Sequence, residues 1–204
     1  MPPLIIDNFA QRSPEWFAAR VGNPGASSAD NIITPTGLIS KQRDAYLWKL
    51  AEETFTGRCE EGFKSKAMMQ GVEREAEARA LFELVMDIEV RQVALVYKDE
   101  LKLFHASPDG LPGEAGLEIK CPIFRNHVQT LDDRKLPSDK FCQVQMNLYT
   151  TERDLWYFLS YYPVLPPCIL EVRRDEGFIA KLEPALLDFA ADLARMVEKL
   201  RAMR

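Results

Sequence analysis

Hydrophobic residues recur every three or four positions along four stretches of the chain, a spacing that predicts four long helices. These stretches are 40–56, 65–87, 138–150 and 176–203. Gly57 should end the first helix, because glycine readily adopts the left-handed conformation found at helix C-termini. Pro184 lies inside the last stretch and predicts either a kink or a later start for that helix.

Two shorter helices are expected near the N-terminus. Ser13 can cap a helix that begins at Pro14 and closes near Gly22, since serine suits the cap and proline the first helical position. A second short helix should begin around Ala26 and stop before Pro35.

Runs of aliphatic and aromatic residues predict the strands of a sheet. They lie at 90–98, 102–106, 116–121, 155–161 and 169–172. The stretch between 102–106 and 116–121 is rich in proline, glycine and glutamate, which is typical of a hairpin connection. We therefore expect an α/β (α+β) fold in which helices flank a central mixed β-sheet. The 204 residues, 47% of them hydrophobic, fit one compact domain spanning 1–204.

Composition argues against several classes of protein. No apolar run is long enough to cross a bilayer, and the N-terminus lacks a basic region followed by an apolar core, so a soluble, intracellular protein is expected. The four cysteines have no metal-ligand or disulfide-framework spacing, which argues against an iron–sulfur nuclease. His105 and His127 are too few and too far apart in sequence to indicate a zinc site.

The net charge of −5 is unusual for a protein that binds nucleic acid. A carboxylate-rich metal pocket lowers the net charge, however, whereas contact with DNA requires only a local basic surface. Most basic residues are expected to be solvated surface; the candidates for contact are Arg12, Arg20, Lys41, Arg43, Lys64, Lys66, Arg125, Arg134 and Lys135.

Candidate chemistry is concentrated in Ser107-Pro108-Asp109-Gly110-Leu111 and the following Leu117-Glu118-Ile119-Lys120. Side chains alternate across a strand, so Glu118 and Lys120 share one face, with Asp109 beside them at the end of the neighbouring strand. Two acids and a lysine are a minimal set for metal-assisted phosphodiester hydrolysis. Each fragment alone is also typical of an ordinary turn or a half-exposed strand.

Glu75 is the one charged residue in a helical stripe that is otherwise small or apolar. The stripe consists of Met68, Gly71, Glu75, Ala78, Phe82 and Val85. An inward carboxylate needs a hydrogen bond, a cation or a metal. From periodicity alone, a functional acid and a glutamate paired with Arg79 one turn later are equally good interpretations.

In this order, the motifs resemble the bacteriophage lambda exonuclease family (YqaJ-type viral recombinases) of the PD-(D/E)xK nuclease superfamily. The similar segments are WFAARVG at 16–22, ASSA at 26–29, KAMMQGVEREAEARALFE at 66–83, SPDGL at 107–111, LEIKCP at 117–122 and QVQ at 143–145. The resemblance implies a restriction-endonuclease-like core and a Mg²⁺-dependent exonuclease that degrades the 5′-ended strand of linear duplex DNA. The resulting 3′ overhangs would serve homologous recombination.

The resemblance also assigns roles to residues. Asp109, Glu118 and the backbone carbonyl of Ile119 would bind Mg²⁺, while Lys120 would position and activate the attacking water. Two ions are expected, and Mn²⁺ should be able to substitute. Glu75 would assist through metal-bound water, and Gln143 would help to place the water or the scissile phosphate.

A second set of residues matches the family's pocket for a 5′-terminal phosphate: Arg20, Ser27 and Ser107. The alternative interpretations are a cation at a helix C-terminus for Arg20 and a simple cap for Ser27. Met68 falls where a wedge between the strand ends is expected, although a methionine in such a stripe is more often core, and Lys66 could touch the DNA backbone.

By the same resemblance we expect a homotrimeric ring, a single-strand annealing recombinase as partner, and a bacterial cytoplasm as the location, with the protein encoded by a phage or its host. The resemblance is weak over 123–139, where a basic residue of the lambda enzyme is displaced to Arg125 or replaced by Asn126. Two alternatives stay open: a structure-specific endonuclease or resolvase on the same core, and a catalytically silent DNA-binding module.

Overall fold

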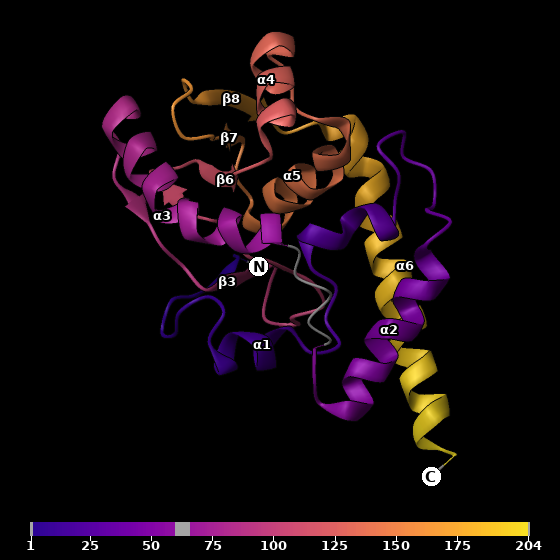
Figure 1. Ribbon diagram of the computed structural model, residues 1–204. Coiled ribbons are helices and arrows are strands. Elements are labelled where there is room, and N and C mark those ends of the chain that lie inside the picture. Colours follow the sequence, from indigo (N-terminus) through magenta and orange to yellow (C-terminus); the bar gives the residue numbers. More distant parts are fainter. Residues whose placement is uncertain (1, 60–65, 204) are drawn as a thin grey trace.

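The computed structural model describes the backbone of residues 2–59 and 66–203 and the side chains of 2–59 and 73–203 (Figure 1). Its helices are α1 (Pro14–Arg20), the 3₁₀ helix η1 (Ala26–Asn31), α2 (Arg43–Thr56), α3 (Lys66–Met86), α4 (Phe124–Asp133), α5 (Ser138–Thr151) and α6 (Glu176–Arg201). Its strands are β1 (Leu4–Ile6), β2 (Val90–Arg91), β3 (Leu95–Tyr97), β4 (His105–Ala106), β5 (Leu111–Pro112), β6 (Gly116–Lys120), β7 (Leu155–Ser160) and β8 (Cys168–Arg173).

The centre of the fold is the mixed sheet β6-β7-β8. Strand β6 pairs in parallel with β7, and β7 pairs antiparallel with β8. A parallel pair requires a long crossover, which α4 and α5 supply between β6 and β7. The expected mixed sheet flanked by helices is therefore confirmed.

The two faces of this sheet are covered by different helices. Leu117 and Ile119 of β6 pack on one face with Ala78 and Phe82 of α3. On the opposite face, strand β7 packs against α5 through a cluster formed by Val144, Leu148, Trp156 and Phe158. Because side chains alternate along β6, Glu118 and Lys120 belong to the face that α5 covers.

Helix α5 is buried on nearly all sides. Its far side joins a second core, in which Cys142 and Met146 pack with residues of η1, α2 and α6. Figure 1 shows α2 and α6 lying side by side at the edge of the molecule, with α5 between them and the sheet. A helix enclosed in this way holds its polar side chains in fixed positions. Gln143 and Asn147 of α5 are thereby fixed beside β6.

A separate antiparallel sheet, β1-β3-β4, carries α1. Trp16 of α1 packs with Leu95 and Tyr97 of β3. The cap of this helix is confirmed, since the Ser13 side chain accepts a hydrogen bond from the backbone N–H of Trp16. Gly57 likewise ends α2 with a positive φ of 68°.

Several expectations were wrong in detail. Residues 90–98 form two strands rather than one, because β2 pairs with β5 and β3 pairs with β1 and β4. The hairpin partner of β6 is the segment 110–112, through the bridge between Gly110 and Leu117, and not 102–106. Residues 105–106 instead pair with β3. Hydrogen bonding between distant segments decides these partners, and alternation within one segment does not reveal it.

Two helices also differ from expectation. The polar segment after β6 contains α4, whose buried His127 and Thr130 hold it against the molecule. Pro184 lies inside α6, which begins at Glu176, so the later start is wrong. In a third helix, α3, Val85 is exposed although it belongs to the predicted inward stripe.

Among the helices whose residues are described, none has the length and apolar character needed to cross a membrane.

Candidate active site

Asp109 is attached to β6 by backbone hydrogen bonds on both sides. Its N–H donates to the carbonyl of Leu117 at 3.0 Å, and the Leu117 N–H donates to Gly110 at 2.9 Å. The Asp109 carboxylate in turn accepts a hydrogen bond from the Ile119 N–H at 2.6 Å. Asp109 therefore lies against the strand that carries Glu118 and Lys120, as predicted, although the segment paired with that strand is 110–112 and not 102–106. We call Asp109, Glu118 and Lys120 the acidic site.

Glu118 is the most enclosed member of the acidic site, with 2% of its surface exposed. Its carboxylate accepts hydrogen bonds from Lys120, from the Gln143 amide at 2.7 Å and from the Asn147 amide at 3.1 Å. Gln143 and Asn147 are one turn apart on α5, so both amides point to the same place. This network holds Glu118 in a single orientation.

The charges at this site are incompletely balanced. Burial, followed by the negative charges of Glu118 and Glu75, raises the pKa of Asp109 to about 8, despite the nearby lysine. The pKa of Lys120 is raised above its usual value: its burial acts in the opposite direction, but the charges of Glu118 and Asp109 outweigh it. Lys120 is thus held as a cation, and one lysine serves two carboxylates.

The donor set at this site fits a hard divalent cation. Asp109 and Glu118 offer carboxylate oxygens, and the intervening Ile119 offers a backbone carbonyl, the kinds of ligand that Mg²⁺ prefers. Within the described part of the chain, no three His, Cys, Asp or Glu side chains converge into a ready-made metal cage. An ion bound here would keep several waters, which is usual for Mg²⁺.

Glu75 is placed at the edge of this site by two arginines. Its carboxylate contacts Arg79 at 3.0 Å, one turn along α3, and Arg12 at 2.6 Å. Arg79 also donates to the backbone carbonyl of Asp109 at 3.0 Å. The pairing of Glu75 with Arg79 was one of the two interpretations of the stripe, and the structure bears it out. The Arg79 bond also links Glu75 to the acidic site.

Arg20, Ser27 and Ser107, which we call the arginine pocket, come from three different segments. Gly25 and His105 form a parallel bridge, and Ser27 and Ser107 each lie two residues beyond it. Ser27 is exposed, whereas the Ser107 hydroxyl is buried and has no hydrogen-bond partner among the described residues. Arg20 ends α1 and stacks on Trp16, with 3.9 Å between its guanidinium carbon and the ring centre.

No Asp or Glu in the described parts of the chain forms an ion pair with Arg20. Burial is the main reason that its pKa is lowered. A partly buried cation without a carboxylate and a buried hydroxyl without a partner are suited to an anionic ligand. The side chains of Lys66 and Met68 lie outside the described residues.

Sequence reasoning missed the supporting roles of three residues around the acidic site, although it named one of them, Arg12, as a candidate for DNA contact. Asn147 has a local signal, because it lies four residues after Gln143 on the same helix face. Arg12 and Gln11 have none: Arg12 reaches Glu75, and the Gln11 amide donates to the carbonyls of Val93 and Pro108. Their roles depend on contacts between segments far apart in the chain.

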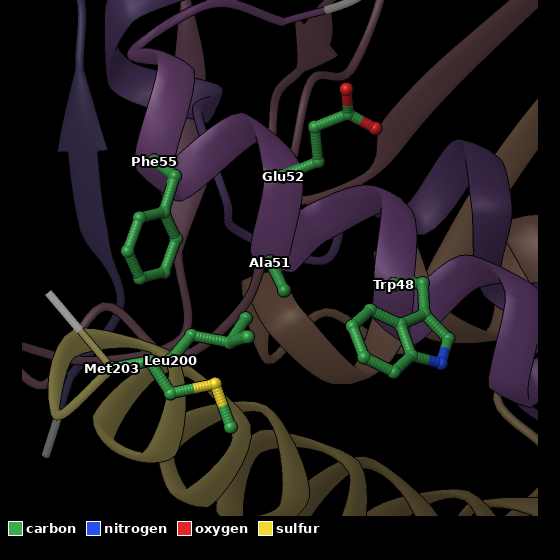
Figure 2. Close-up of a pocket in the computed structure, with 6 residues that line it drawn as sticks. All are labelled: Trp48, Ala51, Glu52, Phe55, Leu200 and Met203. Atoms are coloured by element: carbon green, nitrogen blue, oxygen red, sulfur yellow. The ribbon is translucent and has the colours of Figure 1, made fainter.

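An apolar groove elsewhere on the molecule contains none of these residues. Figure 2 shows it between α2 and the end of α6. It is lined by Trp48, Ala51, Glu52, Phe55, Leu200 and Met203. The groove is therefore separate from the acidic site and from the arginine pocket.

Fold and site together define a nuclease-type core of the PD-(D/E)xK kind, in which an acid precedes a strand bearing Glu-x-Lys. Residues 15–154 match the YqaJ-like viral recombinase domain, and the chain belongs to that family. An alkaline exonuclease from Laribacter hongkongensis, LHK-Exo, is 32% identical with a TM-score of 0.85; the match covers 94% of this chain and 97% of that one. LHK-Exo in complex with dAMP matches over the same shares, at 31% identity and a TM-score of 0.84.

Two more distant relatives extend the comparison. A phage related exonuclease from Haemophilus somnus 129PT shares the fold, with 13% identity, a TM-score of 0.63 and coverage of 87% of this chain and 96% of that one. The uncharacterized protein R354 of Acanthamoeba polyphaga mimivirus is 26% identical over 172 residues. The match covers 76% of this chain but 30% of the viral protein, so the chain spans under a third of that relative. Family and close structural matches support a nuclease with a role in recombination.

Proposed function

We propose that this protein is a Mg²⁺-dependent 5′→3′ exonuclease that degrades the 5′-ended strand of linear double-stranded DNA and leaves 3′ overhangs for recombination. The observation that carries the proposal is the acidic site: Asp109 is bonded to the backbone of β6 between Glu118 and Lys120, and burial together with the charge of Glu118 raises the pKa of its carboxyl group. A divalent cation and a phosphodiester would together balance that site.

Each residue of the acidic site has a definite task in this mechanism. Asp109, Glu118 and the Ile119 carbonyl would hold the ion, with Mn²⁺ able to replace Mg²⁺. When bound, Mg²⁺ would lower the pKa of the attacking water and neutralise charge on the scissile phosphate. Lys120 is already cationic and bonded to Glu118, so it would orient the water and stabilise charge that develops on the phosphate, rather than act as a free-amine base.

Gln143 and Asn147 act on the acidic site through Glu118, which they hold by hydrogen bonds. Gln143 is only partly buried and would also contact the water or the phosphate. Glu75 would contribute from the edge of the site through water. Its two arginines hold its carboxylate in place at the edge of the site.

The arginine pocket supports attack at a 5′ end. Ser107 precedes Asp109 by two residues, so their Cα atoms lie at most about 7 Å apart. A terminal phosphate bound by Arg20, Ser27 and Ser107 would put the next phosphodiester of the same strand near the acidic site. LHK-Exo in complex with dAMP is consistent with this scheme, because dAMP is a mononucleotide of the kind that stepwise cleavage releases.

Family membership supports three further features. The protein would form a ring-shaped homotrimer around its DNA, work with a single-strand annealing recombinase, and act in the cytoplasm of a bacterial host, whether encoded by that host or by a phage. Lys66 and Met68 would contact DNA and separate the strand ends. Light scattering of the purified protein checks the trimer directly.

One assay tests the central proposal. Linear duplex DNA with 5′-phosphate ends and a label on either end is incubated with the protein and Mg²⁺, and the products are resolved over time. We expect mononucleotides from the 5′-ended strand, no cleavage with EDTA, and no cleavage by Lys120→Ala, which should still bind ends. Cutting of intact circular duplex would indicate the endonuclease alternative, and binding without degradation would indicate the silent module.

A further inference from the structure

Arg20 is held in place by a buried histidine that the proposed mechanism does not otherwise use. The Arg20 Nε–H donates to Nε2 of His105 at 3.1 Å, while Trp16 covers one face of the guanidinium. With Nε occupied and one face stacked, the two terminal nitrogens of Arg20 are the donors that the described residues leave for a ligand.

The hydrogen bonds of His105 determine its tautomer. Arginine can only donate, so Nε2 of His105 must accept and its proton must lie on Nδ1. Nδ1 lies 2.9 Å from the Asn23 side-chain oxygen, which accepts that proton. The Asn23 amide nitrogen in turn donates to the Lys102 carbonyl, which sets the orientation of the amide. Arg20, His105 and Asn23 thus form one directed chain of donors and acceptors.

His105 is kept neutral in this position. Only 2% of its surface is exposed, and burial, followed by the charge of Arg20, lowers its pKa to about 3. A neutral ring is required, since an imidazolium could not accept from Arg20 and would repel it.

Backbone contacts with Pro24 and Gly25 fix the position of His105 beside Arg20. Its N–H donates to the Pro24 carbonyl at 3.1 Å, and its ring lies directly over Gly25. A Cβ added to Gly25 would come within 2.7 Å of Nε2, the atom that accepts from Arg20. Glycine at position 25 therefore makes room for the His105 ring. The backbone does not require glycine here, because φ at Gly25 is −108°, which any residue can adopt.

We infer that His105 is the positioning residue that makes the arginine pocket selective for 5′-phosphorylated ends. It fixes the guanidinium through Nε and leaves the two terminal nitrogens to bind a terminal phosphate together with Ser27 and Ser107, so that the phosphate meets a preformed site. Without that acceptor, Arg20 is free to turn, and the advantage of a phosphorylated end over a hydroxyl end is lost. The inference rests on the proposed function and adds to it the residue that sets end selectivity.

The test compares two duplexes that differ only in a 5′-phosphate or a 5′-hydroxyl on one end. Their kcat/KM ratio is measured for the wild type, Arg20→Ala, His105→Leu, His105→Gln and Gly25→Ala. His127→Leu is the matched control, since His127 is also buried with both ring nitrogens bonded, but to Ser160 and the Pro166 carbonyl. The Kd of each protein for the 5′-phosphate and the 5′-hydroxyl duplex is also measured in EDTA, where no cleavage occurs, and the two Kd values are compared as a ratio.

His105→Leu should lower the phosphate preference about tenfold or more, the size expected for a lost hydrogen bond to a charged group. His105→Gln places an amide oxygen near the former Nε2 and should restore most of the preference. His127→Leu should keep the wild-type ratio. If His105→Leu does not fold, Gly25→Ala carries the test, because its Cβ displaces the ring without removing it.

The outcomes separate the inference from the function on which it rests. A wild type that prefers phosphorylated ends, together with folded His105→Leu and Gly25→Ala proteins that keep this preference, would overturn the inference alone. Equal ratios of phosphorylated to hydroxyl ends for the wild type and Arg20→Ala would contradict phosphate binding by the arginine pocket itself. A protein that binds phosphorylated ends in EDTA but never cleaves them would leave the inference standing and contradict the nuclease.

Discussion

The acidic site and the arginine pocket lie at the two ends of one short segment, residues 107–109, and their charges are unbalanced in opposite senses. At the first, two carboxylates share Lys120, and the pKa of Asp109 is raised. At the second, Arg20 is bonded to a neutral histidine and has no carboxylate partner in the described structure. A DNA end with a bound divalent ion would satisfy both, since its phosphates match the arginine and its metal matches the acids.

The two regions also differ in how they are supported. Glu118 is held by side chains from its own strand and from α5, an enclosed helix. Arg20 is held by residues of α1, β4 and the loop before η1, segments that belong to the smaller sheet and its surroundings. The proposed chemistry thus lies at the enclosed centre of the fold, whereas the proposed end recognition lies at its periphery. Changes in the two regions should therefore have separable effects.

The largest effect is expected at the acidic site. Asp109→Asn should lower the cleavage rate about a thousandfold or more, because a proposed metal ligand is lost. It should also raise the melting temperature in EDTA, since an amide can keep the Ile119 hydrogen bond without a repelled charge. Asp133→Asn, at an exposed position of α4, is the control for both measurements. An unchanged or lowered melting temperature would contradict the idea of uncompensated charge at Asp109.

Asn147 offers a sharper probe of the same region. Asn147→Leu removes a hydrogen bond to Glu118 from a residue that is 1% exposed. Residues that support metal ligands typically change metal affinity about 10–100-fold. We expect the Mg²⁺ concentration for half-maximal activity and the Kd for Mn²⁺ measured by calorimetry to rise by that amount. Asn126→Leu on exposed α4 should change neither, and unaltered Mn²⁺ binding by Asn147→Leu would remove Asn147 from this role.

The pH dependence of stability should have opposite signs in the two regions. His105 has a folded pKa of about 3, below its unfolded value, so its contribution is present above pH 6.5 and is lost as the pH falls. Relative to His105→Leu, the wild type should lose about 2 kcal/mol of unfolding free energy between pH 7.5 and 5. Urea titrations in EDTA measure this, and a constant difference would contradict a buried neutral histidine.

Asp109 should behave in the reverse way in the same titrations. Its folded pKa is raised, so its contribution to stability is present at low pH and is lost as the pH rises toward 8. Relative to Asp109→Asn, the metal-free wild type should therefore become less stable between pH 5 and 8. A difference that grows in favour of the wild type over this range would show that the Asp109 carboxylate is already compensated.

The smallest effect is expected for Arg12, whose side chain is 45% exposed. Arg12→Ala leaves Glu75 paired with Arg79, so it should cost less than about 1 kcal/mol in urea unfolding, the usual range for an exposed ion pair. Arg79→Ala should lower cleavage more than Arg12→Ala, because Arg79 also donates to the Asp109 carbonyl. Equal cleavage rates for the two variants would contradict the idea that Arg79 links Glu75 to the acidic site.

Much of the local structure could be predicted from the chain. The spacing of apolar residues indicates α2, α3, α5 and α6, and the cap at Ser13 and the stop at Gly57 follow from the preferences of single residues. Alternation places Glu118 and Lys120 on one face of β6. The predicted neighbouring segment added Asp109, and the family resemblance added Gln143; the structure brings both into one hydrogen-bonded group with that strand. Their catalytic roles stay predictions.

The sequence by itself therefore determined the elements and the acids of the candidate site, since both depend on spacings of a few residues. Only the tertiary structure decided that β4 pairs with β3 and not with β6. It also decided that Asn147 binds Glu118, that Arg12 binds Glu75, and that His105 holds Arg20. The physical reason is sequence separation: Arg12 and Glu75 are 63 positions apart in the chain, and Arg20 and His105 are 85 positions apart. Such contacts form only when the whole core is packed, and no local pattern of hydrophobic and polar residues encodes them.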